Sequence, residues 1–256
     1  VSHINGYLLS APDVFIQSRG KPLYANMPEM SKGSQPTDGG NLIFSEDERK
    51  ELIALHPEIE PFMHRYISAD DYINNKYRYC IWLDKVSPSK YRNIPIIMKR
   101  LELVAECRRK SPTASVKLAA DTPMIFTQIR QPSTMYLAMP EVSSSRRRYI
   151  PFGYMSPDVI ASNMLYLVPN VDLYMFGVMT SNVHMSWLRV VGGRLKSDYR
   201  YTPAVYNNFP WCSPTDEQKA KIEHTAQMIL DARNMYPDCS LADLYDEMTM
   251  PPELRK

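Results

Sequence analysis

Charged side chains occupy every second position of the stretch 196–201, which reads K-S-D-Y-R-Y. In an extended strand, Lys196, Asp198 and Arg200 would project from one face. A lysine donates hydrogen bonds to guanine O6 and N7, and an aspartate accepts one from cytosine N4. Because same-face residues two apart on a strand lie about 7 Å from each other, Lys196 and Asp198 could address the two bases of one G·C pair. The alternative is an ordinary salt-bridged surface strand, which residue chemistry alone favours.

The residues around this stretch are suited to presenting it to a polar partner. Gly192 and Gly193 precede it, and glycine adopts backbone turns that other residues resist. Pro203 ends it, because proline lacks the N–H that a sheet ladder needs. The apolar run 205–211 predicts an anchor to a core.

A second basic segment, 143–148, reads S-S-S-R-R-R. Adjacent hydroxyls and guanidinium groups suit contacts to DNA phosphates, which fix the register of a protein on DNA. The alternative is a solvated surface turn, and without other information that alternative is favoured. The residues concerned are Ser144, Ser145, Arg146, Arg147 and Arg148.

The chain lacks the motifs of the common catalytic sites. It has no glycine-rich phosphate loop with a lysine, no nucleophile elbow and no histidine pair at metal-ligand spacing. It also lacks a strand–turn–helix for S-adenosylmethionine and the Asn/Asp-Pro-Pro-Tyr/Phe motif that holds a flipped adenine. Pro12 and Asp13 match only the start of a nuclease PD…(D/E)xK motif. We therefore expect no catalytic residue, metal or cofactor in this chain.

The bulk properties describe a folded protein of nearly balanced charge. Hydrophobic residues make up 44% of the 256 residues, which is enough for a packed core, and the net charge of +2 neither requires nor excludes nucleic acid. The four cysteines (Cys80, Cys107, Cys212 and Cys239) form no CxxC pair, so we expect reduced, mostly buried thiols in a cytoplasmic protein. The stretch 173–188 is too short and too polar to span a membrane.

The start of the chain shows neither a signal peptide nor an initiator methionine. We therefore expect it to begin inside a longer polypeptide.

Periodicity and capping signals predict the elements that position these residues. Ser45 and Glu48 form a capping-box pattern, and Ile97, Leu101 and Val104 recur at helical spacing. The predicted helices cover 46–56, 58–67, 94–109, 172–191, 214–235 and 240–245, with another starting near 251. The predicted strands cover 14–16, 77–83, 125–129, 134–138, 148–152 and 165–168.

Two features of the helices have plain structural explanations. The methionines of 172–191 are expected to fill the core, with His184 as a structural histidine. The basic end of the helix 94–109, Arg108-Arg109-Lys110, is expected to complement the helix dipole rather than to bind phosphate.

The order of these elements predicts an α+β fold. We expect an irregular lead-in over 1–44, a mixed α/β domain with several short strands over 45–212, and a helical appendage over 213–256.

Several blocks of the sequence resemble one known family. G-R-L-K-S-D-Y-R-Y followed by V-Y-N-N-F-P-W resembles a segment late in the target recognition domain of fused DNA methyltransferase–restriction enzymes, the MmeI-like (Type IIL) family. Further matching blocks follow the family's order over most of the chain: 11–15, 38–42, 78–83, 142–147, 149–153, 240–246 and 250–256.

The resemblance implies a sequence-specific domain for duplex DNA within a larger adenine-N6 methyltransferase. S-adenosylmethionine and the catalytic groups, together with any nuclease, would lie in the upstream part. The family associates positions matching Lys196 and Asp198 with the choice of one base, and positions matching Glu141 and Asn163 with another. A glutamate can accept from cytosine N4, and an asparagine can pair with adenine.

With this resemblance, phosphate contacts become the favoured interpretation of residues 144–148, and Arg194 and Arg200 are expected to join them. The alternative function is a protein–protein interaction or scaffold module without direct DNA contact. Clustering of the six cations Arg146, Arg147, Arg148, Arg194, Lys196 and Arg200 would favour DNA, and their dispersal would favour the scaffold.

Overall fold

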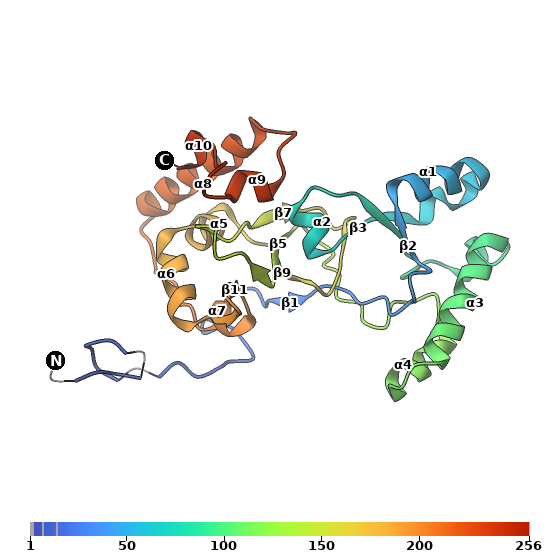
Figure 1. Ribbon diagram of the computed structural model, residues 1–256, viewed down its shortest axis with the longest axis horizontal. Coiled ribbons are helices and arrows are strands. Elements are labelled where there is room, and N and C mark those ends of the chain that lie inside the picture. The colour runs from blue at the N-terminus through green and yellow to red at the C-terminus, as the bar shows by residue number, and fades with distance from the viewer. Residues whose placement is uncertain (1–2, 7, 14, 256) are drawn as a thin grey trace. The chain divides into compact units, whose positions relative to one another are not determined.

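The computed structural model describes residues 3–6, 8–13 and 15–255, which form two compact units (Figure 1). The first unit comprises Val1–Ser31, Tyr136–Tyr154 and Tyr166–Lys256, and the second comprises Lys32–Met135 and Met155–Leu165. Each unit therefore combines segments that are distant in sequence.

The second unit is built on a four-stranded sheet with the order β2-β4-β3-β8. Its strands are β2 (Ile43–Ser45), β3 (Met63–Ile67), β4 (Arg78–Ile81) and β8 (Ile160–Ala161). β4 pairs antiparallel with both neighbours, so that Cys80 lies opposite Ile43 and His64, whereas β3 and β8 are parallel. Phe44, Ile59 and Ile81 are buried in the same cluster as Ile97 of the longest helix of this unit.

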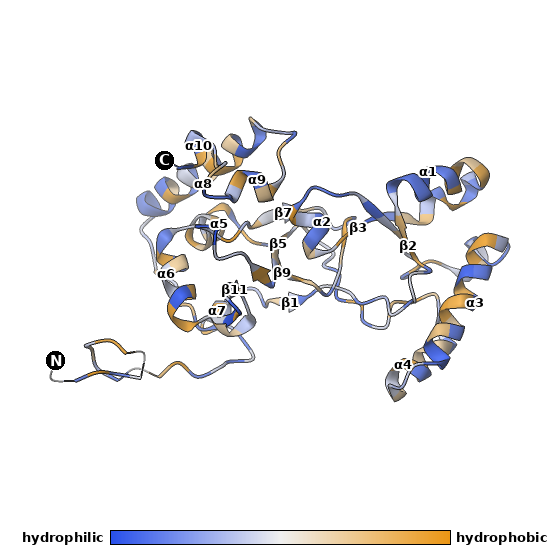
Figure 2. Cartoon of the chain, in the orientation of Figure 1, coloured by the Kyte–Doolittle hydropathy of each residue, from blue (hydrophilic) through white to orange (hydrophobic). Residues whose placement is uncertain are grey.

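The helices of the second unit follow their capping and periodicity signals. α1 (Glu46–Leu55) begins at the predicted capping box, where the Glu48 N–H donates to Ser45 Oγ (3.2 Å) and the Ser45 N–H donates to Glu48 Oε2 (2.7 Å). α3 (Pro95–Arg109) buries the predicted apolar positions and carries hydrophilic residues between them (Figure 2). The shorter helices are η1 (Pro57–Phe62), α2 (Ala69–Ile73), η2 (Pro88–Lys90), α4 (Ala114–Leu118) and η3 (Ala119–Asp121).

The first unit has its core at the sheet with the order β1-β9-β5-β7. The strands are β1 (Ser31–Lys32), β5 (Tyr136–Pro140), β7 (Gly153–Met155) and β9 (Leu165–Pro169). All five residues of β5 are buried. A separate three-stranded sheet with the order β10-β11-β6 consists of β6 (Val142–Ser143), β10 (Gly193–Leu195) and β11 (Asp198–Arg200).

Six helices complete the first unit: α5 (Leu173–Met179), α6 (Asn182–Val191), α7 (Pro203–Asn207), α8 (Asp216–Asn234), α9 (Leu241–Tyr245) and α10 (Pro252–Arg255). α5 and α8 pack closely, because a Cβ added at Gly177 would lie 2.8 Å from Ile222 Cγ2. The predicted apolar anchor is present, since Val205, Tyr206 and Phe209 are buried in the same core.

Side-chain caps explain two wrong helix predictions. The predicted helix 172–191 is two helices, because Ser181 caps α6 through its Oγ and donates to the carbonyl of Val178 (2.6 Å). The helix predicted over 214–235 is α8, which begins at Asp216, because Thr215 is its N-cap and forms a capping box with Gln218. The methionine prediction is confirmed, since Met175, Met179 and Met185 are buried.

Other predicted elements differ in type from the observed ones. The second half of the predicted helix 58–67 is strand β3, and the predicted strands 125–129 and 148–152 are irregular apart from a single bridge at Gln128. In the predicted strand 14–16, position 14 lies outside the described residues, and residues 15 and 16 form no strand.

The fold is a mixed α+β domain with three small sheets and a C-terminal helical segment. None of the helices in the described part combines the length and apolar character that a bilayer crossing requires.

Candidate nucleic-acid interface

The stretch 196–201, predicted to be one strand, forms the turn and the second strand of a β-hairpin. β10 and β11 pair antiparallel, with Leu195 opposite Asp198 and Gly193 opposite Arg200. Lys196 is the first residue of the two-residue turn and has a left-handed φ of 57°. The prediction that Lys196 and Asp198 share a strand face is therefore wrong: the backbone turns at Lys196, which places its exposed side chain at the hairpin tip.

The hairpin joins the serine–arginine segment in one sheet. β11 pairs antiparallel with β6, so that Tyr199 lies opposite Ser143 and Arg200 opposite Val142. The chain leaves β6 into a turn, where the Ser145 N–H donates to Asp198 Oδ1 (3.0 Å). The two basic stretches singled out from the sequence thus lie side by side in the first unit.

Glu141 and Arg200 form an ion pair across this sheet. Arg200 Nε and Nη2 both donate to Glu141 Oε1, at 2.9 and 2.7 Å. The Glu141 side chain is 12% exposed and the Arg200 side chain 51%. The hydrogen bonds that Arg200 donates to Glu141 raise the pKa of Arg200. Glu141 is therefore engaged in holding a neighbouring guanidinium group.

Arginines surround the tyrosine of the hairpin. Arg194 stacks over the Tyr199 ring with its Cζ 4.4 Å from the centroid, and its Nη1 donates to the carbonyl of Ser197 (2.8 Å). A hydrogen bond with Arg189 lowers the pKa of Tyr199 against the opposing effect of burial, and Arg194 acts in the same direction. Two guanidinium groups, those of Arg189 and Arg194, therefore lie beside the hairpin tyrosine.

Lys196 differs from these arginines in its contacts. Its side chain is exposed and forms no hydrogen bond or ion pair with any residue that the structure describes. Its ammonium group is accordingly available to an external acceptor.

The three adjacent arginines are not equivalent. Arg146 is 80% exposed and lies 3.8 Å from Asp246 Oδ2. Arg147 is half-buried, its backbone bridges to Asp246, and burial lowers the pKa of its guanidinium group. Only Arg146 and Arg148 are thus exposed as a phosphate-binding side chain requires.

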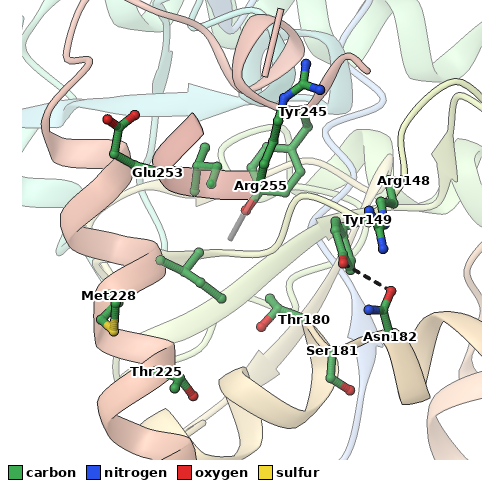
Figure 3. Close-up of a pocket in the computed structure, with 12 residues that line it drawn as sticks. Arg148, Tyr149, Thr180, Ser181, Asn182, Thr225, Met228, Tyr245, Glu253 and Arg255 are labelled. Carbon is green, nitrogen blue, oxygen red and sulfur yellow. Dashed lines mark hydrogen bonds between the residues drawn. The ribbon is translucent and has the colours of Figure 1, made fainter. Parts of the chain in front are cut away.

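Arg148 borders a cavity of about 410 Å³. Its guanidinium group lies 5.4 Å from the Tyr149 ring centroid, and the Tyr149 hydroxyl donates to Asn182 Oδ1 at the start of α6 (3.0 Å). Figure 3 shows Arg148 beside Tyr149 and Asn182, with Arg255 on another side of the cavity.

Asn163 belongs to the second unit. It lies in the turn between β8 and β9, where its N–H donates to the carbonyl of Ser34 (3.0 Å) and its side chain is half-buried. The other predicted site residues all belong to the first unit.

Sequence reasoning missed Asp246 and Arg189. Asp246 lies after α9 and reaches the turn 144–148 only through tertiary packing, so local patterning gave no signal for it. Arg189 is in the last turn of α6, where a basic residue is explained by the helix dipole alone.

The remaining candidate chemistry is sparse. No group of three histidine, cysteine or acidic side chains among the described residues could hold a metal ion. The four cysteines are free, but only Cys80 is buried, Cys107 is half-buried, and Cys212 and Cys239 are exposed, so the prediction of mostly buried thiols is wrong. His184 is buried beside Tyr201 (Nε2 to hydroxyl oxygen, 2.9 Å), and burial lowers its pKa to about 3, as befits a structural histidine.

Known proteins resemble the chain over its whole length. The family model described as "MmeI, target recognition domain" matches residues 10–213, and that described as "MmeI, C-terminal domain" matches residues 214–256. DNA methyltransferase A of Bacillus subtilis (strain 168) is 35% identical over 256 residues, which are 100% of this chain and 29% of that protein.

A solved structure of the Type IIL restriction-modification enzyme MmeI in complex with DNA is also similar. It superposes with a TM-score of 0.93 at 42% identity, covering 99% of this chain and 34% of that one. The chain thus spans about a third of the length of these relatives. By its match over residues 10–213, the chain belongs to the MmeI target recognition domain family.

Proposed function

We propose that this chain reads the sequence of duplex DNA for a longer polypeptide that methylates adenine at N6, and that it contributes no catalytic group. The observation that carries the proposal is the assembly of two basic stretches, distant in sequence, into one hairpin and its adjoining turn. The MmeI structure that resembles the chain is a complex with DNA, which supports the same partner.

The hairpin is the element proposed to enter the major groove, which admits a two-stranded β-ribbon. Lys196 at its tip would donate to guanine O6 or N7. Asp198 would accept from cytosine N4 through Oδ2, while its Oδ1 stays bound to the Ser145 N–H. The Ser145 amide would fix the rotation of the carboxylate, which favours one base edge over another.

Glu141 and Arg200 would act as a pair. Arg200 binds Glu141 through Nε and Nη2, which fixes the orientation of the planar guanidinium group. Its third nitrogen, Nη1, would then donate to a phosphate or a base. Asn163 would read a further base, through the hydrogen bonds that an asparagine makes with adenine.

The remaining contacts would position the protein without reading sequence. Arg146, Arg148 and Arg194 are exposed, and with Ser144 and Ser145 they are proposed to contact phosphates. Half-burial argues against the same role for Arg147.

Methyl transfer would take place elsewhere in the longer polypeptide. S-adenosylmethionine would bind there, as would any nuclease active site, and residues 1–44 would lead in from the methyltransferase domain. Residues 45–212 would recognise DNA, and residues 213–256 would support them.

A binding assay tests the proposal directly. The full-length polypeptide would be titrated onto a fluorescent duplex pool at several salt concentrations. Binding should weaken steeply with salt, because phosphate contacts release counterions. Absence of salt-sensitive binding would refute the proposal and leave the scaffold alternative.

A further inference from the structure

The arginine turn 144–148 is held on two sides within the first unit. On one side, the Ser145 N–H donates to Asp198 Oδ1 of the hairpin (3.0 Å). On the other side, the backbone of Arg147 bridges antiparallel to Asp246, and Arg146 Nη2 lies 3.8 Å from Asp246 Oδ2. The turn therefore connects the hairpin to the segment that follows α9.

The half-buried Arg147 lies within this connection. Burial lowers the pKa of its guanidinium group, while Asp246 and Asp198 both act to raise it. Its Nε is buried and has no hydrogen-bond partner in the described part of the chain. The half-buried Arg147 side chain is thus less free to move than a phosphate ligand on the surface, and its backbone bridge to Asp246 ties the turn to the segment after α9.

Hydrogen bonds within the segment after α9 fix the conformation of Asp246. Asp246 Oδ1 accepts from the Met248 N–H (3.0 Å), which leaves Oδ2 for Arg146. Arg255 closes the loop by donating to the carbonyls of Met250 (2.9 Å) and Glu247 (2.7 Å).

The same segment is anchored to the body of the first unit. Tyr149 packs against the buried cluster of Leu244, Tyr245 and Met250. Arg233 of α8 donates to the Tyr245 hydroxyl (Nε, 3.0 Å) and to the carbonyl of Phe152 (Nη1, 2.6 Å), just beyond the turn.

We propose that Asp246 is a positioning residue for DNA recognition, through which the C-terminal helical segment sets the position of the arginine turn against the hairpin. This inference rests on the proposed function. It assigns to residues 214–256, which match a separate family model, an indirect part in sequence discrimination. Asp246 itself would touch no DNA.

Charge reversal and its rescue test the inference. The experiment uses the full-length variants Arg146→Asp and Asp246→Arg and the double swap. Each would be titrated onto a duplex that carries the sequence methylated by the wild-type polypeptide, and onto duplexes that differ from it by one base pair. Each single variant should lower the discrimination ratio about twofold to fivefold, as loss of a partly exposed ion pair and a new repulsion would. The double swap should restore most of the ratio.

A milder variant separates positioning from folding. Asp246→Asn keeps the acceptor for the Met248 N–H but removes the charge that holds Arg146. It should lower the discrimination ratio about threefold without weakening binding to unrelated duplexes, because the released Arg146 can still contact phosphate. A residue with a merely structural role would weaken both kinds of binding together.

Asp238→Asn is the matched control. It makes the same charge change on an exposed residue of the same segment, whose side chain makes no described contact. Wild-type discrimination in Asp246→Asn, or failure of the double swap to rescue folded single variants, would overturn the inference. If the wild-type polypeptide binds no duplex at all, the proposed function itself fails, and thermal melting would identify variants that do not fold.

Discussion

Arg108 in the second unit donates to five backbone carbonyls, whereas Arg200 in the first unit is paired with one carboxylate and remains half exposed. The guanidinium group of Arg108 is fully buried and binds the carbonyls of Pro36, Thr37, Ala119, Thr122 and Ile125, at 2.8–3.0 Å. All its donors are satisfied within the protein. In Arg200, Nε and Nη2 bind Glu141, and Nη1 has no hydrogen bond to any residue that the structure describes.

The difference shows that arginines of this chain differ in how many of their donors the protein itself satisfies. Arg108 was singled out from the sequence in a basic cluster at the end of a helix, and Arg200 in a stretch of alternating charges. Arg108 was expected to complement the end of α3, but burial lowers its pKa and its contacts reach back to the loop before α1. The number of donors left unsatisfied, rather than local charge, separates a structural arginine from a candidate DNA ligand.

Arg108→Lys should have the largest effect and should act on stability alone. A lysine ammonium cannot satisfy five carbonyls, so buried acceptors would be left unpaired, at a cost of about 3–5 kcal/mol in the free energy of unfolding. Urea denaturation measures this cost. The exposed Arg109→Lys is the control and should change stability by less than about 0.5 kcal/mol. Equal free energies of unfolding in the two variants would contradict the structural role assigned to Arg108.

Asp71→Asn should have a smaller effect that depends on pH. Burial raises the pKa of Asp71, but hydrogen bonds from Arg78 and Ser68 outweigh it, so the net shift is downward. The ionised carboxylate therefore stabilises the fold at pH values above 3.8, the ordinary pKa of an aspartate. This contribution is lost as the pH falls through the lower pKa that Asp71 has in the folded protein.

The variant should cost about 1–2 kcal/mol at pH 7, discounted for the partly exposed Arg78. The difference from wild type in urea denaturation should narrow below pH 3.8. A difference that widens on acidification would contradict the assignment.

Arg148→Ala should have the smallest effect on stability and a measurable one on DNA binding. Arg148 is exposed and has no described hydrogen bond from its guanidinium group. Its loss should weaken binding to all sequences alike and reduce the slope of log K against log salt by about 1. Lys221→Ala on α8, which removes an equal charge from an ion pair with Glu217, serves as the control. Equal slopes of log K against log salt in the two variants would show that Arg148 does not contact DNA phosphates.

Local signals predicted much of the scaffold but little of the site's geometry. The capping box at Ser45 and the apolar spacing of α3 are local, and both elements are present. The hairpin turn escaped prediction because a left-handed lysine is uncommon and Lys-Ser is no standard turn signal.

Long-range contacts were beyond sequence reasoning for a different reason. The Glu141–Arg200 pair and the bridge of Arg147 to Asp246 join residues that are distant in the chain. Nothing in the local pattern of either partner identifies the other. The residue types of the candidate site could be identified from sequence, but their pairing required the tertiary structure.

Mapping of methylated positions tests the central claim most directly. The full-length polypeptide would carry Lys196→Asp together with Asp198→Lys, with Asp198→Asn as the single variant that keeps an acceptor for Ser145. If the hairpin tip reads one G·C pair, the exchange should change the base accepted at one position of the site and leave the others unchanged. The single variant should lose about 1–3 kcal/mol of discrimination at that position. Methylation of the original site by the exchanged variant, or loss of specificity at several positions at once, would contradict the account.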